Sequence, residues 1–431
     1  MMPKQSGKLV LTQVAALCVL LVMLGGCGGS SKTVAHSADA AKTVGDPASR
    51  ANALVDAANP VGTPSSFSGG AHTVGVFARR GTGAGELTEP FGIAVDHRNG
   101  DMYVVDSNDE RVEKFSSSGR FLFAWGWGVA DGRTPALQTC TKRCYAGLRG
   151  DGEAQLNFAE GVAVDNEPGS RSRGDVYVAV LHGGGRIDKF SPDGRFLLTF
   201  GGGVNQTARE HHDRADEDVC PVRRGDVCGK SSDGHAGGQL EITVEGSFIA
   251  VGPHGTVYVG QRNSVKTFSP DGRYLSRITL TPPPITSEGR EAGGVSQLVV
   301  DRSGKLYVVR HEVIGVDVYL PSGKLVRTLE PGGVPTYDEG PTPALALDPA
   351  GDLFVDVYAD ETHRIDEYNP SGVRIASFDR GPKSPPGIAD REDGLPGMAY
   401  NPRTKLLYVV NSDVNVKPIV SDVRAIVPPR P

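Results

Sequence analysis

Three glutamates and one glutamine stand just before short apolar segments of the chain, at Glu89, Glu160, Glu245 and Gln297. Carboxylate and amide oxygens are the ligands that Ca²⁺ prefers, and a bound divalent metal can activate water or polarise a carbonyl group. If those apolar segments are the inner strands of a ring, the four side chains surround the mouth of its central channel. The glutamates fall in two different registers, however, and the second half of the chain adds only Gln297 and prolines. We therefore expect no resident cofactor, with a Ca²⁺ or Zn²⁺ site as the alternative.

Three arginines open corresponding segments of the chain, at Arg111, Arg186 and Arg364. They would face an anionic ligand or, alternatively, pair with an aspartate or a backbone carbonyl in their own segment. His182 and His311 follow matched segments and would line one face, with a solvated loop as the alternative. We take these five residues as candidate contacts on the rim of the channel. No Gly-x-Ser-x-Gly elbow occurs, so we predict no catalytic nucleophile.

Aspartate or asparagine begins a tight turn in most of the repeated segments, at Asp96, Asp165, Asp301, Asp348 and Asn401. These side chains accept hydrogen bonds from the backbone N–H groups that follow them, so we interpret them as turn residues and not as a metal-binding ring. Large aromatic residues dominate packing between sheets, and we expect Trp125 and Trp127 to lie between neighbouring repeats.

The chain contains six cysteines, of which Cys18 and Cys27 lie near the N-terminus. The other four form two close pairs, Cys140 with Cys144 and Cys220 with Cys228. An even number of cysteines in an exported protein predicts disulfides, and neither spacing is that of a zinc knuckle. Three pairings are open, and the two local ones are the simplest. A metal site assisted by His211 and His212 is the alternative.

The N-terminus reads as an export signal. Lys4 and Lys8 precede an apolar run over residues 9–24, which is short for a lasting membrane span. The sequence LGGC at residues 24–27 resembles the lipobox of bacterial lipoproteins. The resemblance implies cleavage after residue 26 and lipidation of Cys27, and two or more acyl chains form a stable membrane anchor. An ordinary signal peptide with an incidental cysteine is the alternative.

The composition of the rest of the chain limits its possible structure and partners. Residues 27–70 are rich in Ala, Ser and Gly and cannot bury enough surface to offset the entropy of ordering, so we predict a flexible tether there. The formal net charge is −6, and removal of the signal takes away two further lysines. Nucleic-acid binding needs a basic surface, so we expect no nucleic-acid partner. We expect a monomer in the cell envelope, outside the cytoplasm and anchored to the membrane by lipid.

A repeated unit of two apolar strands, a tight turn and a second turn occurs six times between residues 71 and 427. The unit beginning at Gly92, GIAVDHRNGDMYVVD, is its clearest copy. Glycine in the turns supplies the positive φ that tight hairpins require. Units of this length with four strands predict an all-β protein, a six-bladed β-propeller of four-stranded antiparallel blades. Residues 428–431 would form a tail.

A ring of blades must close. The last unit offers strands over residues 397–401, 406–410 and 416–420 but no clear fourth. We predict that residues 73–78 supply it, with the tail at 423–429 as a competitor for the same position.

The stretch GAGELTEPFGIAVDHRNGDMYVVDSNDERVEKFSSSGRF resembles the NHL repeat, strongly in the first two units and weakly in the third, fourth and sixth. Asp106 and Asn108 match the pattern of that family, whereas Val180 and Gly260 replace the aspartate in the next two units. The resemblance implies a six-bladed propeller. It leaves function open, because NHL folds include binding platforms and metal-dependent lyases.

We therefore predict a binding scaffold for a protein or glycan ligand. Its contact surface would be the two cysteine-bearing insertions, residues 129–152 and 202–238, which both follow the outer strand of a blade. The alternative is an exported hydrolase or lyase, lactonase-like or amidoglycolate-lyase-like, with a metal at the channel mouth.

Overall fold

The computed structural model describes residues 72–232, 234, 237–241, 248–282, 285, 293–311, 313–331, 342–359, 362–379, 397–413 and 420–428. The predicted signal, Cys27, the tether at 27–70 and Glu245 lie outside these residues. The described residues form six antiparallel sheets with two short helical turns, α2 (Gln206–Glu210) and η1 (Pro253–Gly255). None of these residues forms a helix that is long and apolar enough to cross a membrane.

Each sheet is one blade, and in blades 1 to 5 the strands run from the ring centre outwards in chain order. Blades 1 and 2 have five strands each: β2 (Pro90–Val95), β3 (Met102–Asp106), β4 (Arg111–Phe115), β5 (Phe121–Trp127) and β6 (Leu137–Cys140), then β7 (Ala159–Val164), β8 (Val176–Val180), β9 (Arg186–Phe190), β10 (Phe196–Phe200) and β11 (Val219–Cys220).

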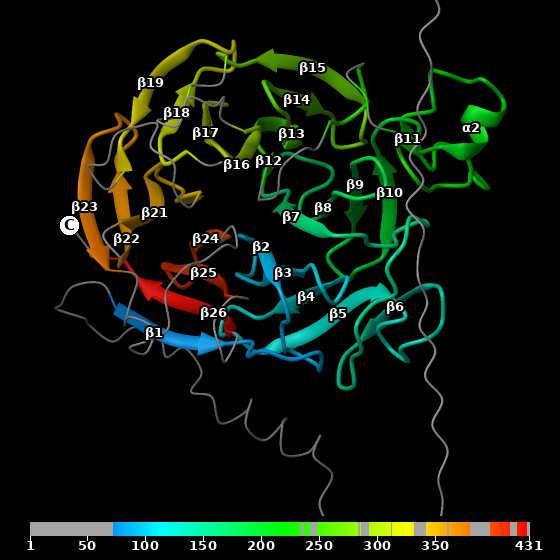
Figure 1. Ribbon diagram of the computed structural model, residues 1–431, viewed down its shortest axis with the longest axis horizontal. Coiled ribbons are helices and arrows are strands. Elements are labelled where there is room, and N and C mark those ends of the chain that lie inside the picture. The colour runs from blue at the N-terminus through cyan, green and yellow to red at the C-terminus, as the bar shows by residue number, and fades with distance from the viewer. Residues whose placement is uncertain are drawn as a thin grey trace, which may run out of the picture. The chain divides into compact units, whose positions relative to one another are not determined.

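The next three blades have four strands each: β12 (Ile249–Val251), β13 (Val257–Gly260), β14 (Ser264–Phe268) and β15 (Tyr274–Thr279), then β16 (Val295–Val300), β17 (Leu306–Arg310), β18 (Val316–Tyr319) and β19 (Leu325–Leu329), then β20 (Ala344–Leu347), β21 (Leu353–Ala359), β22 (Thr362–Tyr368) and β23 (Arg374–Asp379). The inner strands contact one another all the way round, β2 with β7, β7 with β12, and so on to β24 with β2 (Figure 1). The predicted six-bladed β-propeller is confirmed.

Blade 6 joins the two ends of the domain. It consists of β24 (Met398–Asn401), β25 (Leu406–Asp413), β26 (Val420–Val427) and β1 (His72–Phe77). The register pairs Phe77 with Val423, which confirms that the N-terminal segment supplies the fourth strand. Residues 416–419 of the predicted third strand lie outside the described residues. The described third strand is β26, which includes most of the tail that competed for the fourth position.

The turn residues act as predicted. The Asp301 carboxylate accepts hydrogen bonds from the backbone N–H groups of Ser303 and Lys305, at 2.8 and 2.9 Å. Asp348 accepts three such bonds from the three residues 350–352. These carboxylates are therefore committed to local turns.

Neighbouring blades are joined by large side chains. Trp125 is fully buried, and its ring centroid lies 5.9 Å from that of Tyr103 and 5.6 Å from that of Phe190 in blade 2. The Tyr103 hydroxyl and the Lys114 ammonium donate to the same carbonyl oxygen, of Pro192 in blade 2. The prediction for Trp125 is correct. Trp127 instead donates to the carbonyl of Glu153, in the connection between blades 1 and 2.

The inner strands of blades 1, 2 and 6 approach so closely that glycine is required. A Cβ on Gly92 would lie 2.3 Å from the backbone oxygen of Glu160, and a Cβ on Gly397 would lie 2.3 Å from that of Phe91. Such contacts are below any real Cβ separation, so a larger residue would push the strands apart. In this sector the channel wall is packed backbone against backbone.

Closure predicts the effect of removing one side chain from β1. Phe77 packs on Phe115 and Tyr408, with ring centroids 5.2 and 6.1 Å away, whereas Val76 on the same strand is 46% exposed. We expect Phe77→Ala to lower the free energy of unfolding by about 2–3 kcal/mol, because a partly buried aromatic ring leaves a cavity. The matched change Val76→Ala should cost less than about 0.5 kcal/mol. Equal shifts in a guanidinium titration would contradict a closing role for β1.

Candidate functional site

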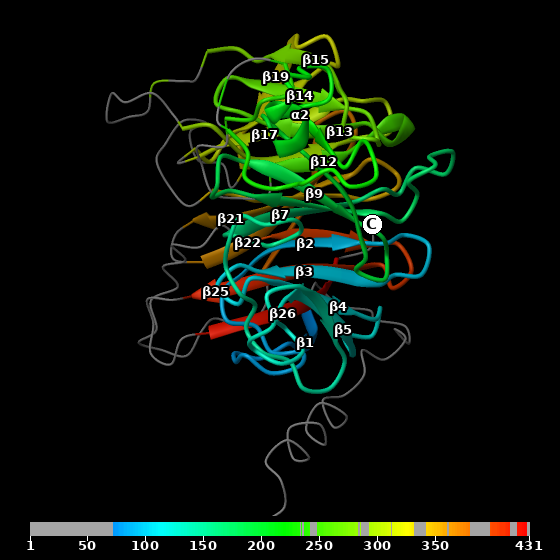
Figure 2. The same cartoon turned by 90° about the vertical axis from the view of Figure 1, so that its right-hand side faces the viewer.

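The alternation of strands gives the propeller two ends. The hairpin turns within a blade, such as β2–β3 and β4–β5, lie at one end, and the β3–β4 and blade-to-blade connections lie at the other. We call the second end the insert face, because insert 1 (residues 129–152) and insert 2 (residues 202–238) both start there. Figure 2 shows the ring from the side, with β2 and β7 running across the view.

Each insert adds a strand to the blade that it follows. Insert 1 adds β6 beside β5, with Trp125 opposite Thr139, and insert 2 adds β11 beside β10, with Thr199 opposite Cys220. Both inserts therefore cover the outer edge of a blade, at the right of Figure 1. Their disulfides are the two local ones, Cys140–Cys144 and Cys220–Cys228, which settles the pairing that the sequence left open.

The predicted channel-mouth ligands do not form a visible metal site. Glu160 and Gln297 are buried, with 1% and 2% of their surface exposed, and Glu89 is half-buried. Within the described part of the chain no three His, Cys, Asp or Glu side chains gather closely enough to hold a metal ion. Glu245 is outside that part.

The predicted rim arginines are mostly interior. Arg111 and Arg186 are essentially unexposed, and Arg364, the third, has a side chain that is 32% exposed. The guanidinium of Arg186 lies 3.0 Å from the Asp188 carboxylate and that of Arg364 lies 3.2 Å from Asp366. Of the two alternatives that the sequence left open, Arg111 and Arg186 follow the second, because carboxylates and carbonyls of the fold surround them.

Arg111 is the most heavily coordinated of the three. Its guanidinium donates to the carbonyl oxygens of Thr82, Gly83 and Glu86, which precede β2, and to that of Tyr145 in insert 1. Its Nη2 also lies 2.9, 3.4 and 3.8 Å from three carboxylates, those of Glu113, Asp109 and Asp106. A single cation therefore ties the chain before blade 1, the blade itself and insert 1 together.

Three buried carboxylates around one cation cannot all ionise without cost. Burial raises the pKa of Asp106 to about 7, although Arg111 and the N–H groups of Thr88 and Glu89 act against the rise. Burial also raises the pKa of Glu113 well above its usual range. The folded protein therefore holds protons in this cluster at mildly acidic pH.

A fourth arginine, in blade 4, also ties neighbouring blades together, and the repeat pattern did not predict it. Arg310 ends β17 and donates to the carbonyls of Arg262 and Thr281, in blade 3 and in the connection that follows it. The repeat offers arginine at the start of the third strand, so the pattern gave no reason to look at the end of the second. His311, the neighbouring candidate, exchanges backbone hydrogen bonds with Gly293 and Gly294.

A cluster of side chains lies at the seam between blades 1 and 2, on the insert face. It consists of Glu110 in the β3–β4 connection, Arg149 in insert 1, Phe158 directly before β7, and His182 in the β8–β9 connection. We call it the seam cluster. Of its members, only His182 was a predicted site residue.

The seam cluster is built around Glu110, which is 2% exposed. Its carboxylate accepts a hydrogen bond from Nε of Arg149 and another, at 3.0 Å, from the backbone N–H of Phe158. The Arg149 guanidinium lies 4.2 Å from the centroid of the Phe158 ring, and the His182 ring centroid lies 4.6 Å from the same Phe158 centroid. Burial raises the pKa of Glu110 while the hydrogen bond from Arg149 opposes it.

Backbone strain concentrates at the same place. Glu110, Ala154 and Phe158 all have left-handed backbones, with φ of 45°, 55° and 53°. Side chains beyond Gly and Asn adopt this conformation at a cost, and such residues gather at functional sites more often than elsewhere. The strain makes the seam cluster the best-defined candidate site among the described residues.

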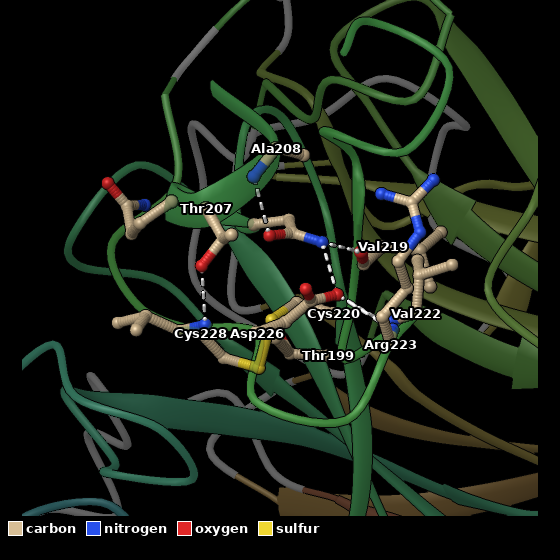
Figure 3. Close-up of a disulfide and its surroundings, with 12 residues drawn as sticks. Thr199, Thr207, Ala208, Val219, Cys220, Val222, Arg223, Asp226 and Cys228 are labelled. Atoms are coloured by element: carbon tan, nitrogen blue, oxygen red, sulfur yellow. Dashed lines mark hydrogen bonds between the residues drawn. A yellow bond between two sulfur atoms is a disulfide. The ribbon is translucent and has the colours of Figure 1, made fainter. Parts of the chain in front are cut away.

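Insert 2 is organised by a buried polar network (Figure 3). Asn205 caps α2 by accepting from the N–H of Ala208 at 3.0 Å, and its amide donates to Val219 and Asp226. The Asp226 carboxylate also accepts from the N–H groups of Val222 and Arg223, and the bond from Arg223 lowers the pKa of Asp226. The Cys220–Cys228 disulfide closes this loop. His211 and His212 lie on its exposed side, outside any group of three potential ligands among the described residues.

Insert 2 is also attached to blade 2. The Ser231 hydroxyl lies within hydrogen-bond distance of the carbonyl oxygens of Gly183, Gly184 and Gly185 in the β8–β9 connection and can donate to one of them at a time. Together with the contacts of insert 1, this bond joins both inserts and two strand connections into one fixed surface.

Comparison with known proteins adds little on function. No family model matches the chain. Over 133 residues it is 30% identical to Protein brain tumor from Drosophila melanogaster, a stretch that covers 31% of this chain and 10% of that protein. The chain thus matches a small part of that relative.

Solved structures with a similar fold include a streptogramin B lyase, at a TM-score of 0.41 and 11% identity over 81% of this chain and 98% of that one. A gluconolactonase from Xanthomonas campestris matches at a TM-score of 0.42 and 12% identity, covering 84% of this chain and 99% of that one. A protein of unknown function from Bacteroides caccae matches at 0.39 and 13% identity, over 67% and 81% of the two chains. At this level of similarity none of them bears on activity.

The buried Asp106 predicts a pH dependence of stability. Its pKa is higher in the folded state than in the unfolded state. The stability that Asp106 contributes to the folded protein is therefore fully present below about pH 4, its pKa in the unfolded chain, and is lost as pH rises through about 7. Asp106→Asn removes this titration. We expect the variant to be destabilised more at pH 5 than at pH 8, by on the order of 2 kcal/mol in the free energy of unfolding.

The control for this measurement is Asp271→Asn, which changes an exposed carboxylate in a turn of blade 3. Because the side chain is exposed, the change should alter the free energy of unfolding by less than about 0.5 kcal/mol. A pH-independent difference between wild type and Asp106→Asn would mean that Asp106 is ionised throughout.

Proposed function

We propose that this protein is an NHL-type propeller that acts as a recognition scaffold for a protein ligand outside the cytoplasm. The observation that supports this function most is the surface formed by inserts 1 and 2. A disulfide closes each insert internally, and hydrogen bonds attach insert 1 to Arg111 of blade 1 and insert 2 to the β8–β9 connection of blade 2. Loops that are fixed on a rigid scaffold before binding lose little entropy when a ligand arrives. The disulfides also accord with an oxidising compartment.

The enzyme hypothesis has less support. It requires oxygen or nitrogen ligands that converge on the channel mouth, whereas Glu160 and Gln297 are buried and the sector between blades 6, 1 and 2 is closely packed. No observation on the described residues favours a hydrolase or lyase.

The test of the scaffold is replacement of the exposed side chains of both inserts by alanine in the full-length chain, with the buried residues and cysteines kept. We expect crosslinking in the native envelope to lose its specific partner, because the surface that selects it is gone. As a control, the same change is made in the hairpin turns at 117–120 and 270–273, at the opposite end of the propeller. Unchanged capture by the insert variant would refute the proposal.

We also propose that Cys27 anchors the chain to a membrane through lipid. The change Cys27→Ser removes the only thiol of the LGGC sequence. We expect the wild type to partition with membranes and to carry acyl chains on Cys27 by mass spectrometry, and the variant to be released or retained as precursor. An unacylated mature wild type would contradict lipid anchoring.

A further inference from the structure

Arg149 of the seam cluster is held in position, but the edge of its guanidinium that carries the two terminal amino groups, its binding edge, is free. Arg149 uses Nε for Glu110 and lays its guanidinium against Phe158. No hydrogen bond joins its two terminal amino groups to any of the residues that the structure describes, and its side chain is 45% exposed. A guanidinium held in this way presents a fork of parallel N–H donors, which matches a carboxylate in two-point geometry.

The neighbouring charges do not occupy this fork. Asp109 lies against Arg111, and the Asp151 carboxylate accepts from the Asn157 amide at 2.8 Å. Glu153 is exposed, and its backbone carbonyl accepts from Trp127. The anion that best complements Arg149 is therefore one that comes from outside the molecule.

The surrounding insert is basic although the protein as a whole is acidic. Insert 1 has four cations, Arg133, Lys142, Arg143 and Arg149, and two carboxylates, Asp131 and Asp151. All four cations are exposed, and both carboxylates are partly buried and accept hydrogen bonds from neighbouring groups of the chain. A local positive field on a negative protein attracts and orients acidic partners.

The geometry distinguishes between kinds of anion. Sugar rings bind proteins by stacking on free aromatic faces, but the ring of Phe158 is already in contact with Arg149 and His182. The cations are spread from the outer edge of blade 1 to the seam, over a surface that follows β6 and the β3–β4 connection. Such a spread suits an extended acidic segment better than a small molecule, which needs a concave site.

We propose that Arg149 binds a carboxylate of an acidic segment on a protein partner, and that Arg133 and Lys142 steer that segment to the seam between blades 1 and 2. This inference rests on the proposed recognition function and names the chemistry of the partner. Glu110 and Phe158 act as positioning residues, because they hold Arg149 and do not themselves reach the partner.

The test measures binding of a labelled oligoglutamate peptide to the intact protein by fluorescence anisotropy. Arg149→Gln should weaken binding about tenfold or more, the loss expected for charge-assisted hydrogen bonds. Arg120→Gln removes the same charge from an exposed turn at the opposite end and should change the affinity less than about twofold. Equal losses in both variants, or no binding of the peptide by the wild type, would overturn the proposal.

Two further arms keep the result decisive. Arg149→Lys keeps the charge that balances Glu110 and should fold even if Arg149→Gln does not. Lysine lacks the planar fork, so we expect a loss of affinity of about threefold or more, and wild-type affinity in Arg149→Lys would overturn the proposal.

Tighter binding of oligogalacturonate or of a single-stranded RNA than of oligoglutamate would overturn the acidic protein segment as the ligand and assign a glycan or a nucleic acid instead. If the insert variant loses its partner while Arg149→Gln keeps it, the scaffold stands and only the role of Arg149 fails.

Discussion

Closure of the ring by β1 is the constraint on which the other features of this propeller depend. Each inner strand contacts the inner strands on both sides, so a gap at one blade removes support from two neighbours. Blade 6 fills that position with strands from both ends of the domain, and Phe77 places an aromatic ring between β4 of blade 1 and β25 of blade 6. The blades are thereby held in a fixed order, and surfaces that span two blades, such as the seam cluster, acquire a fixed geometry.

Buried arginines are the second source of rigidity, and they explain why the rim is less polar than the sequence suggests. Arg111, Arg186 and Arg310 each donate to carbonyl oxygens of the chain that joins one blade to another. Burying a guanidinium is costly unless its donors are satisfied, so these contacts also fix the paths of the connections. The arginines that would have served an anionic ligand are used by the fold, and Arg149, which is brought in by insert 1, keeps its binding edge free.

Inserts 1 and 2 break the symmetry of the ring. Blades 3, 4 and 5 end in exposed outer strands, and Tyr274 and Leu275 of β15 are 39% and 54% exposed. Blades 1 and 2 instead carry β6 and β11 on their outer edges, with a disulfide behind each. Function in propellers resides in such local departures from the repeat, because the repeat itself specifies only the scaffold.

The sequence alone determined the architecture. The period of the repeat, the glycines in its turns and the alternation of its strands predicted six blades, the turn aspartates and the closing segment at 73–78. These are local properties, which each repeat expresses through its own backbone and nearest neighbours. It also limited the disulfides to three pairings and included the local ones. The lipidation of Cys27 and the tether remain predictions.

Only the tertiary structure decided which charged residues are free to act. Arg111 and Arg149 both lie within two residues of a carboxylate in the sequence, yet one is buried among three carboxylates and the other is half exposed at a seam. The seam cluster unites residues 110, 149, 158 and 182, and two of them, Glu110 and Phe158, have positive φ angles. The free energy of a charged side chain depends on its burial and on partners that are distant in the chain, and a repeat pattern contains neither.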